Sequence, residues 1–510
     1  MFDLKDLFGA LPPSIVDHQL LLVGLGTVSW LIFGYYKGQS RKLTHIPSIG
    51  SDIPLFSSFG ALNYLLDSRK VINAGVKKWP NAVFKIPDML QWLVVITESR
   101  VIEEIRKAPE SVLSFMESLD EALQLEYTLG KHISLNTYHV PLIRAQLTRA
   151  LPQLVPLVHE EVVDAFNEFI PLTSEWTSVK ASETFMDIIC RASNRVFVGR
   201  PLCRDPDFIA LNVQYTIDVF KTGALLRIVP TFLRPLVNKL ISNVPRKTDD
   251  GLRHLAPLIA ARRKQREESS NTDERPLDFL TWLMDEAKGE EATDWYLASR
   301  ILTVNFTAIH TSSMTFMHAF YYLAAFPEYM TPLREEIEEV IQREGWTKAG
   351  IDQMYKLDSF IKESQRLHPL SVVAMQRVAV KDHTFTDGTM VPRGTTLAVA
   401  LDSVHLNENI YSDPLTFDPF RFVKLKEQDT TGRKFDIVTT SVESLAFGHG
   451  RHACPGRYFA ACELKVMFAH IVMNYDVKLE NENVRPKDLW FVTSCVPNPN
   501  AKVLFRKRVL

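Results

Sequence analysis

The sequence has 510 residues, of which 46% are hydrophobic and 23% charged, the balance of a globular chain with a sizeable core. A formal net charge of −2 gives no electrostatic reason to expect nucleic acid as a partner. Five cysteines, an odd and sparse number, argue against a disulfide framework and for a reducing compartment. No repeat or low-complexity linker divides the chain after its N-terminal region, so one large domain is expected.

The N-terminal region has the features of a membrane anchor. Residues 18–36 are mostly apolar and carry no formal charge, and about this length crosses roughly 30 Å of hydrocarbon as a helix. Basic residues follow the segment and acidic residues predominate before it, an asymmetry that places the following chain in the cytoplasm. We therefore expect a lumenal N-terminus (1–17), a transmembrane helix (18–36), a basic, proline-containing hinge (37–54) and one cytoplasmic domain (55–510). A buried core helix is the alternative interpretation of 18–36.

The first part of the predicted domain mixes strands and helices. Residues 82–86 and 92–97 are rich in β-forming side chains on either side of a Pro-Asp pair, which predicts a hairpin. Residues 114–130, which include Phe115, are expected to be largely loop-like. A helix is expected from Tyr138 to Leu151, and it contains His139 and Arg144.

The middle of the chain is predicted to be mostly helical. Apolar residues recur at three- and four-residue spacing from 160 to 246. Residues 225–236 interrupt this pattern with two prolines in an apolar, basic stretch. That stretch fits either a contact with a membrane surface or a corner between two helices.

A long helix is expected from Asp294 to Phe326, because no glycine or proline occurs before Pro327. Such a helix is roughly 50 Å long and crosses a whole domain. Its centre is unusually polar and also contains a small residue, Ala308. His310 in this centre either passes protons near neutral pH or is a hydrogen-bonded core histidine. Thr311 follows it with a hydroxyl group.

Two arginines and one glutamate form a second pattern. Glu363 and Arg366 are three residues apart, on one face of a predicted helix over 359–367. Such a pair alone is common on exposed helices. It gains weight from Arg421, which lies between this helix and the C-terminal motif described next. Extended segments are expected at 369–374, 395–400 and 491–496.

The stretch Phe447–Gly456 contains three glycines and one proline, which favour a tight, irregular loop. Cys454 lies where this loop enters a predicted helix over 457–475, and the N–H groups of a helix start favour a thiolate. A thiolate on a rigid loop with room for a flat ligand is suited to axial ligation of haem iron. The rival interpretations are a buried apolar cysteine, as expected for Cys190, Cys203, Cys462 and Cys495, and a zinc site made of His449, His452, Cys454 and Cys462. Zinc would leave the other patterns unexplained.

This loop resembles the haem-binding signature of the cytochrome P-450 family at every defined position, and the other motifs follow in the family's order. The resemblance implies that Cys454 is the axial ligand of haem b iron and that Phe447 packs beside its sulfur. Four further residues are implied to bind the haem propionates: His452, Arg377, Arg144 and His139. The family often has tryptophan at the position of Val140, so only half of that motif is present.

The resemblance also assigns roles away from the loop. Thr311 is implied to steer protons to bound oxygen, with His310 in place of the family's usual acid. Glu363, Arg366 and Arg421 are implied to form a structural triad that holds the cysteine loop. The substrate pocket is implied to include Ala308, Val372, Val373, Phe115 and Val492.

The implied protein has a mainly α fold with small β-sheets, the cytochrome P-450 fold, plus one transmembrane helix. It is expected to be a single-pass protein of the endoplasmic reticulum that contacts membrane lipid. Its activity would be a monooxygenation of a hydrophobic small molecule, most like fungal enzymes of terpenoid or related secondary metabolism. The resemblance implies dioxygen and electrons from NADPH, delivered by a separate reductase. By charge complementarity, we expect part of the docking face for this reductase at Arg451, Arg457 and Lys465 near the cysteine loop. A haem-thiolate isomerase or dehydratase, and a non-catalytic haem- or lipid-binding membrane protein, are the alternatives.

Overall fold

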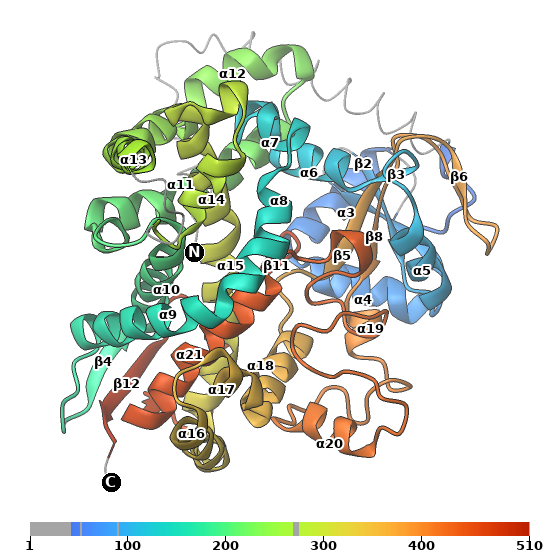
Figure 1. The fold of residues 1–510 in the computed structure, drawn as a ribbon. Helices are drawn as coiled ribbons and strands as arrows, with labels where there is room; N and C mark the ends of the chain where they lie inside the picture. The colour runs from blue at the N-terminus through green and yellow to red at the C-terminus, as the bar shows by residue number, and fades with distance from the viewer. Residues whose placement is uncertain (1–41, 51–53, 89–90, 269–274, 509–510) are drawn as a thin grey trace, which may run out of the picture.

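A computed structural model describes residues 42–50, 54–88, 91–268 and 275–508 of the chain (Figure 1). The predicted lumenal segment 1–17 and the predicted transmembrane helix 18–36 lie outside the described residues, as does part of the hinge 37–54. Within the described ranges, no helix has the length and apolar character needed to cross a membrane.

Helices make up most of the described chain, as the sequence predicts. In chain order the longer ones are α3 (Pro54–Leu66), α4 (Ser68–Lys78), α5 (Ser99–Lys107), α6 (Phe115–Leu123), α9 (Thr148–Phe169), α10 (Ala181–Phe197), α11 (Pro206–Arg227), α12 (Arg234–Ile241), α13 (Val244–Glu268), α14 (Phe279–Glu286), α15 (Asp294–Ala325), α16 (Met330–Glu344), α18 (Tyr355–Leu367), α20 (Arg421–Gln428) and α21 (Arg457–Asn474). Shorter helical pieces are η2 (Leu125–Tyr127), α7 (Lys131–Leu135), α8 (His139–Pro141), η3 (Leu142–Leu147), η4 (Leu202–Arg204), η5 (Thr231–Leu233), η7 (Gly289–Ala292), η8 (Pro327–Tyr329), α17 (Lys348–Gln353), α19 (Asp402–His405) and η9 (Gly450–His452).

The strands form small sheets. The largest has the order β1-β2-β8-β5-β3 and contains β1 (Val83–Asp88), β2 (Gln91–Ile96), β8 (Thr396–Ala400), β5 (Val373–Ala379) and β3 (Leu113–Ser114). In it β2 and β8 are parallel, and the other pairs are antiparallel. The other sheets are β4-β12-β9, from β4 (Thr177–Lys180), β12 (Lys502–Lys507) and β9 (Tyr475–Leu479), the pair β10 (Leu489–Phe491) with β11 (Ser494–Val496), and the pair β6 (His383–Thr384) with β7 (Met390–Val391). The predicted hairpin is β1 and β2.

The helix α15 forms the centre of the fold (Figure 1). It begins after Thr293, whose backbone is extended, and ends at Ala325, just before Phe326 and Pro327, within one residue of the sequence prediction. Most of its side chains are buried, and the apolar ones belong mainly to the largest hydrophobic cluster, which also receives residues from α9, α10, α18 and α21. Because α15 lies inside the fold, exposure at the protein surface does not explain why its centre is polar.

The prediction of a largely loop-like segment over 114–130 is wrong for its first half, because residues 115–123 form the helix α6. Ser114 caps this helix by accepting a hydrogen bond from the Glu117 N–H. Ser118 and Leu123 are buried, and Phe115 comes to lie at the first turn. The Ser114 cap and the burial of Ser118 and Leu123 together stabilise this helix, which is too short to be predicted from the spacing of its apolar residues alone.

The proline-containing stretch 225–236 turns between two helices. The helix α11 ends at Arg227, η5 follows, and α12 starts at Arg234. Several large apolar side chains in and after this turn are exposed, among them Phe232 at 77%, Leu236 at 60% and Leu240 at 78%. A helix corner therefore does form here, and it leaves an apolar surface uncovered.

Candidate active site

The loop around Cys454 is held by its own backbone. Gly448 and Gly450 have φ values of +67° and +77°, which favour glycine, and the Cys454 N–H donates to the Phe447 carbonyl at 2.8 Å. Burial raises the pKa of the Cys454 thiol, while N–H groups of Gly456 and Arg457 bond to its sulfur and lower the pKa, as does the charge of Arg457. Hydrogen bonds from such N–H groups stabilise a thiolate, the form of cysteine that binds a metal.

The other cysteines have different surroundings. Cys190, Cys203, Cys462 and Cys495 are buried, and burial raises the pKa of each thiol. Cys454 is the partly exposed one. Of the five thiols, Cys454 therefore has the accessibility and the donors that metal ligation needs.

Residues predicted to bind haem come together beside this loop from distant parts of the chain. The His452 ring stacks on Phe115 of α6 with centroids 5.1 Å apart. The Arg377 guanidinium, from β5, lies 5.6 Å from the centre of the same Phe115 ring. Arg144 of η3 donates to the carbonyl of Arg451 at 3.0 Å. The cluster carries positive charge next to Cys454, as the recognition of an anionic cofactor requires.

Arg377 provides a test of whether these residues fit a haem. Its side chain is 3% exposed, and its guanidinium donates to the carbonyl of the adjacent Gln376 at 2.7 Å. Burial lowers its pKa to about 10, with the charge of Glu110 opposing this effect. Among the described residues no carboxylate forms an ion pair with Arg377, and a buried guanidinium of this kind is suited to pairing with a carboxylate of a ligand. The donor set fits the propionates of a haem.

Glu110 is a member of this cluster that the sequence does not reveal. Its carboxylate accepts hydrogen bonds from Ser114 at 2.8 Å and from the Phe115 N–H at 3.1 Å, and it lies 2.7 Å from His452 Nε2. It therefore orders the start of α6 against the cysteine loop. An isolated glutamate after a short helix offers no motif by which it could have been found.

His139 is placed differently from the other predicted haem partners. Its Nδ1 lies 2.8 Å from Arg300 Nη1, and Arg300 is itself paired with Glu291 at 2.7 Å. Burial, and next the charge of Arg300, lower the pKa of His139 to about 3. His139 is therefore neutral, and its role as a propionate partner stays a prediction.

The centre of α15 presents an open strip on one face of the helix. Thr307 and Thr311 are exposed and Ala308 and Met314 are half-buried, although the helix around them is buried. The spacing of three and four residues places these side chains on one side. Thr311 Oγ1 donates to the carbonyl of Thr307 at 2.8 Å and also lies 3.1 Å from that of Ala308. A hydroxyl and a small residue thus line accessible space inside the fold.

The remaining predicted pocket residues lie where β5 meets the β10–β11 turn. The Val372 N–H donates to the Thr493 carbonyl at 2.8 Å, which joins the segment before β5 to the turn that contains Val492. Val492 has a positive φ of 53°. Val372 and Val373 are 1% and 6% exposed and pack with Phe84 and Leu93 in a separate hydrophobic cluster. Whether they line a substrate pocket stays a prediction.

Glu363, Arg366 and Arg421 form the predicted triad. Glu363 lies 2.7 Å from Arg366 and 2.9 Å from Arg421, and all three side chains are buried. The arginines also donate to backbone carbonyls of the segment 405–416, namely those of His405, Pro414, Ser412, Asp413 and Thr416. Glu363 holds both guanidinium groups in place, and their remaining N–H groups bind the backbone of the segment 405–416. This one carboxylate therefore orders a segment that has little regular structure of its own.

A second buried polar group supports the segment before the cysteine loop. Lys362 donates to the carbonyls of Phe435 and Asp436, each at 3.0 Å, and burial lowers its pKa to about 8. Lys465 lies 2.6 Å from Asp358 and is 4% exposed. The expectation that Lys465 belongs to a reductase-docking face is therefore wrong, because its charge is buried against Asp358.

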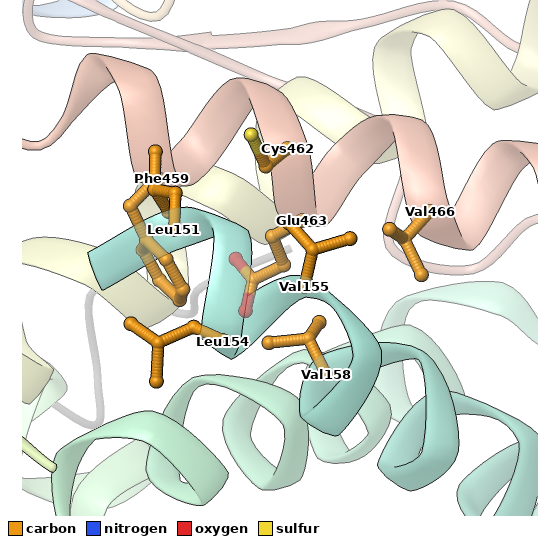
Figure 2. Close-up of a pocket in the computed structure, with 8 residues that line it drawn as sticks. All are labelled: Leu151, Leu154, Val155, Val158, Phe459, Cys462, Glu463 and Val466. Carbon is orange, nitrogen blue, oxygen red and sulfur yellow. The ribbon is translucent and has the colours of Figure 1, made fainter. Parts of the chain in front are cut away.

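Glu463 is a buried acid on α21, the helix that follows the Cys454 loop (Figure 2). It is fully buried beside apolar residues of α9 and α21, in a pocket that leaves no room for a bound molecule. Oε1 accepts a hydrogen bond from Ser193 at 2.6 Å, and Oε2 is buried without a hydrogen-bond partner. Burial raises its pKa to about 7, and the nearby hydroxyl groups of Ser193 and Ser312 oppose this effect. A charged residue in an apolar helical run was the sequence signal for this feature.

One other group of side chains has the composition of a metal site. His318, His368, Asp488 and Cys495 place one ligand atom each within 4.8 Å of one another. However, Arg485 already lies 3.0 Å from both His318 Nδ1 and the Asp488 carboxylate, where a cation would have to bind. The arrangement is therefore satisfied as a network of hydrogen bonds and ion pairs, in which Asp488 also lies 2.6 Å from His368.

Comparison with known proteins identifies the fold and the site together. The family model described as "Cytochrome P450" matches residues 48–505. The chain is 43% identical to "Cytochrome P450 monooxygenase 151" of Postia placenta, over 95% of this chain and 97% of that protein. It is 34% identical to a cytochrome P450 monooxygenase of Ganoderma lucidum over 91% of this chain and 92% of that protein. It is 31% identical to "Ent-kaurene oxidase P450-4" of Gibberella fujikuroi over 98% of this chain and 99% of that protein.

The chain belongs to the cytochrome P-450 family, and it is a cytochrome P-450 monooxygenase. Members of this family bind haem through a cysteine thiolate and use dioxygen, a redox partner and a small-molecule substrate. The fold is mainly helical with small sheets, as the family resemblance implied.

Proposed function

We propose that this monooxygenase oxidises a terpenoid or a related hydrophobic secondary metabolite, at a haem b held by Cys454 and the residues around it. The convergence of His452, Arg377 and Arg144 beside the Cys454 loop carries the proposal for the haem site. The similarity to a protein named as an ent-kaurene oxidase, along almost the whole chain, supports the terpenoid class.

Each group has a distinct part in the proposed mechanism. Cys454 would hold the haem iron through its thiolate, Phe447 would pack beside the sulfur, and Arg377, His452 and Arg144 would pair with the propionates. Bound there, the haem supplies reductive activation of dioxygen for insertion into a C–H bond. Thr311 on the open strip of α15 presents a hydroxyl that would hold and pass a proton at its Oγ1, and the small side chain of Ala308 would leave room for the substrate.

A carbon monoxide difference spectrum of the reduced protein tests the haem site. The wild-type protein should show the strongly red-shifted Soret band of a thiolate-ligated haem, and Cys454→Ala should lack it. Cys462→Ala is the matched control, because Cys462 is a buried cysteine on α21, the helix that follows the Cys454 loop, and this variant should keep the band. The same band in Cys454→Ala would refute the assignment of the ligand.

The substrate class needs a separate experiment. Yeast that co-expresses this chain with a fungal reductase would be supplied with ent-kaurene and other terpene hydrocarbons, and oxidised products would be sought by mass spectrometry. Products that require Cys454 would support the proposal. Active haem protein that oxidises other lipophilic compounds but no terpenoid would refute it.

We propose NADPH–cytochrome P-450 reductase as the electron donor, docked near the exposed Arg451. Arg457 is half-buried and bonded to the carbonyls of Val438 and Cys454, so its contribution is to the loop rather than to the surface. Arg451→Glu should slow electron transfer and weaken its dependence on salt, whereas Arg393→Glu, at an exposed turn, should not. Equal rates for both variants would remove Arg451 from the docking surface.

The proposed location is the endoplasmic reticulum membrane, with 18–36 as the single span and the domain 55–510 in the cytoplasm. The charge asymmetry around 18–36 supports this orientation. The exposed apolar side chains of η5 and α12 support a second contact with membrane lipid.

A further inference from the structure

His310 contacts a neighbouring helix at the position next to Thr311. Its Nε2 lies 3.0 Å from the carbonyl oxygen of Val213, in the middle of α11. Val213 packs against a small apolar cluster formed by Cys190, Ile209 and Ile309, and Ile309 is the neighbour of His310 on α15. The imidazole is therefore the polar member of a mostly apolar contact between helices.

This hydrogen bond fixes the tautomer of the ring. A backbone carbonyl only accepts hydrogen bonds, so the hydrogen lies on Nε2 and the lone pair on Nδ1. Burial lowers the pKa of His310, and the bond to Val213 opposes this without reversing it. The ring is neutral, its one N–H is engaged by the backbone, and Nδ1 takes up a proton only at the cost of a buried charge. These are poor properties for a group that must pass protons repeatedly.

The same bond has a clear mechanical effect on α11. In the part of the chain that the structure describes, it is the one side-chain hydrogen bond between α11 and α15. One turn away along α15, the contact is the ring pair Phe220–Phe306, with centroids 5.1 Å apart. The C-terminal end of α11 is held separately, by Arg227 at 3.0 Å from Asp88 of β1. Without His310, the middle of α11 would be held on α15 by apolar packing alone.

We propose that His310 is a positioning residue, which fixes α11 beside the open strip of α15 through the Val213 carbonyl and so sets the space available to substrate next to Thr311. His310 passes no proton in this assignment, which rests on the proposed monooxygenase site and refines it. Where the family usually has an acid, this chain has a donor to the helix that lies over that site.

Three variants separate positioning from proton relay. His310→Gln keeps an N–H donor of similar reach but cannot relay as an imidazole does. His310→Phe keeps a ring and removes the donor. His310→Glu restores an acid that can relay, but its carboxylate repels the Val213 carbonyl. Positioning therefore predicts that only the glutamine variant resembles the wild type, whereas relay predicts that only the glutamate variant does.

The first readout is amide hydrogen exchange of residues 206–227 in the full-length, haem-loaded protein in detergent, which does not depend on turnover. Loss of one hydrogen bond should speed exchange in the middle of α11 by about fivefold in the phenylalanine and glutamate variants. The glutamine variant should exchange at the wild-type rate. Wild-type exchange in His310→Phe would overturn the proposal.

The second readout is the affinity for two haem ligands, imidazole and the bulky azole clotrimazole, followed by the shift of the Soret band. Only the large ligand must share space with α11, so the phenylalanine and glutamate variants should change clotrimazole affinity several-fold and leave imidazole affinity unchanged. Unchanged clotrimazole affinity in both variants would also overturn the proposal. The carbon monoxide band of each variant shows whether the thiolate site itself is intact, so failure of the haem assignment is seen separately.

Discussion

At the scale of single residues, Glu463 couples folding to pH. The native protein keeps this proton up to a pKa of about 7, whereas the unfolded chain releases it near the ordinary value of 4.5. The group therefore favours the native state fully below the lower of these values, and this contribution is lost as the pH rises through the higher one. A shift of this size corresponds to roughly 3 kcal/mol.

We expect the melting temperature of the wild type, relative to that of Glu463→Gln, to fall as the pH is raised from about 4.5 to about 7. Glutamine stays neutral and keeps an oxygen that accepts the Ser193 hydrogen bond. Thermal unfolding of both proteins across this range measures the difference, and all other titrating groups cancel in it. Parallel curves would show that Glu463 is not protonated in the native state.

Thr311 gives a second prediction for a single residue. Thr311→Ala removes the hydroxyl from the open strip and should lower the product formed per NADPH consumed by about a hundredfold, the smaller end of the effect of one proton-transfer group. Thr311→Ser keeps the hydroxyl and should stay close to the wild type. The measurement compares the rates of NADPH oxidation, hydrogen peroxide release and product formation with a terpenoid that the enzyme oxidises. Equal coupling in Thr311→Ala would exclude this hydroxyl from proton delivery.

At the scale of elements, the triad of Glu363, Arg366 and Arg421 links α18 to the segment before α20. Glu363→Gln keeps the shape of the side chain but leaves two buried guanidinium groups without a compensating charge. Removing one partner of a buried ion pair costs about 3–5 kcal/mol. We expect this variant to melt at a clearly lower temperature and to be purified with little haem.

Glu443→Gln is the matched control for that experiment. Glu443 pairs at 3.4 Å with Arg433 at the surface, where both side chains are about half exposed. Exposed pairs contribute little, so the control should keep its melting temperature and its haem content. Equal haem content in the Glu363 and Glu443 variants would mean that the triad does not hold the cysteine loop.

The elements that follow from local patterns were predictable. The long α15 follows from the absence of glycine and proline, and the Glu363–Arg366 pair from its spacing and its position before Cys454. Elements that depend on tertiary contacts were not. The short α6 needs its Ser114 cap and its packing, and the burial of Lys465 is set by Asp358 on another helix. Sequence spacing contains no information about such partners.

The same distinction applies to the site. Arg377, His452 and Arg144 were expected near haem from the motif order, and the fold brings them to one loop. Glu110 was missed because it has no motif of its own. The ambiguity of His310 could not be settled either, since the Val213 carbonyl lies almost a hundred residues away in the sequence.

At the scale of the whole molecule, α12 and α20 lie at opposite ends of the fold (Figure 1). The apolar residues exposed at η5 and α12, such as Phe232, would bury their side chains in lipid if this end faces the bilayer. Leu415, shortly before α20, is similarly exposed at 78% and provides a comparison.

We expect Phe232→Trp in full-length protein, reconstituted into nanodiscs, to show fluorescence that brominated lipids quench. Leu415→Trp should show none beyond the wild-type background, because the proposed orientation points its end of the molecule away from the membrane. Tryptophan suits this test since its ring favours the headgroup region. Equal quenching at both positions would show that the η5–α12 surface does not define the membrane-facing end.

The meeting of α6, η3, β5 and η9 beside Cys454 has a consequence for biosynthesis. Glu110, Arg144, Arg377 and His452 leave the ribosome in that order, with hundreds of residues translated between the first and the last. Contacts over such long separations form late, after the loops between them have closed. A ribosome-bound chain whose Cys454 has not yet been released from the ribosome has no complete binding site for the prosthetic group. The porphyrin therefore binds only after translation of the chain is nearly complete.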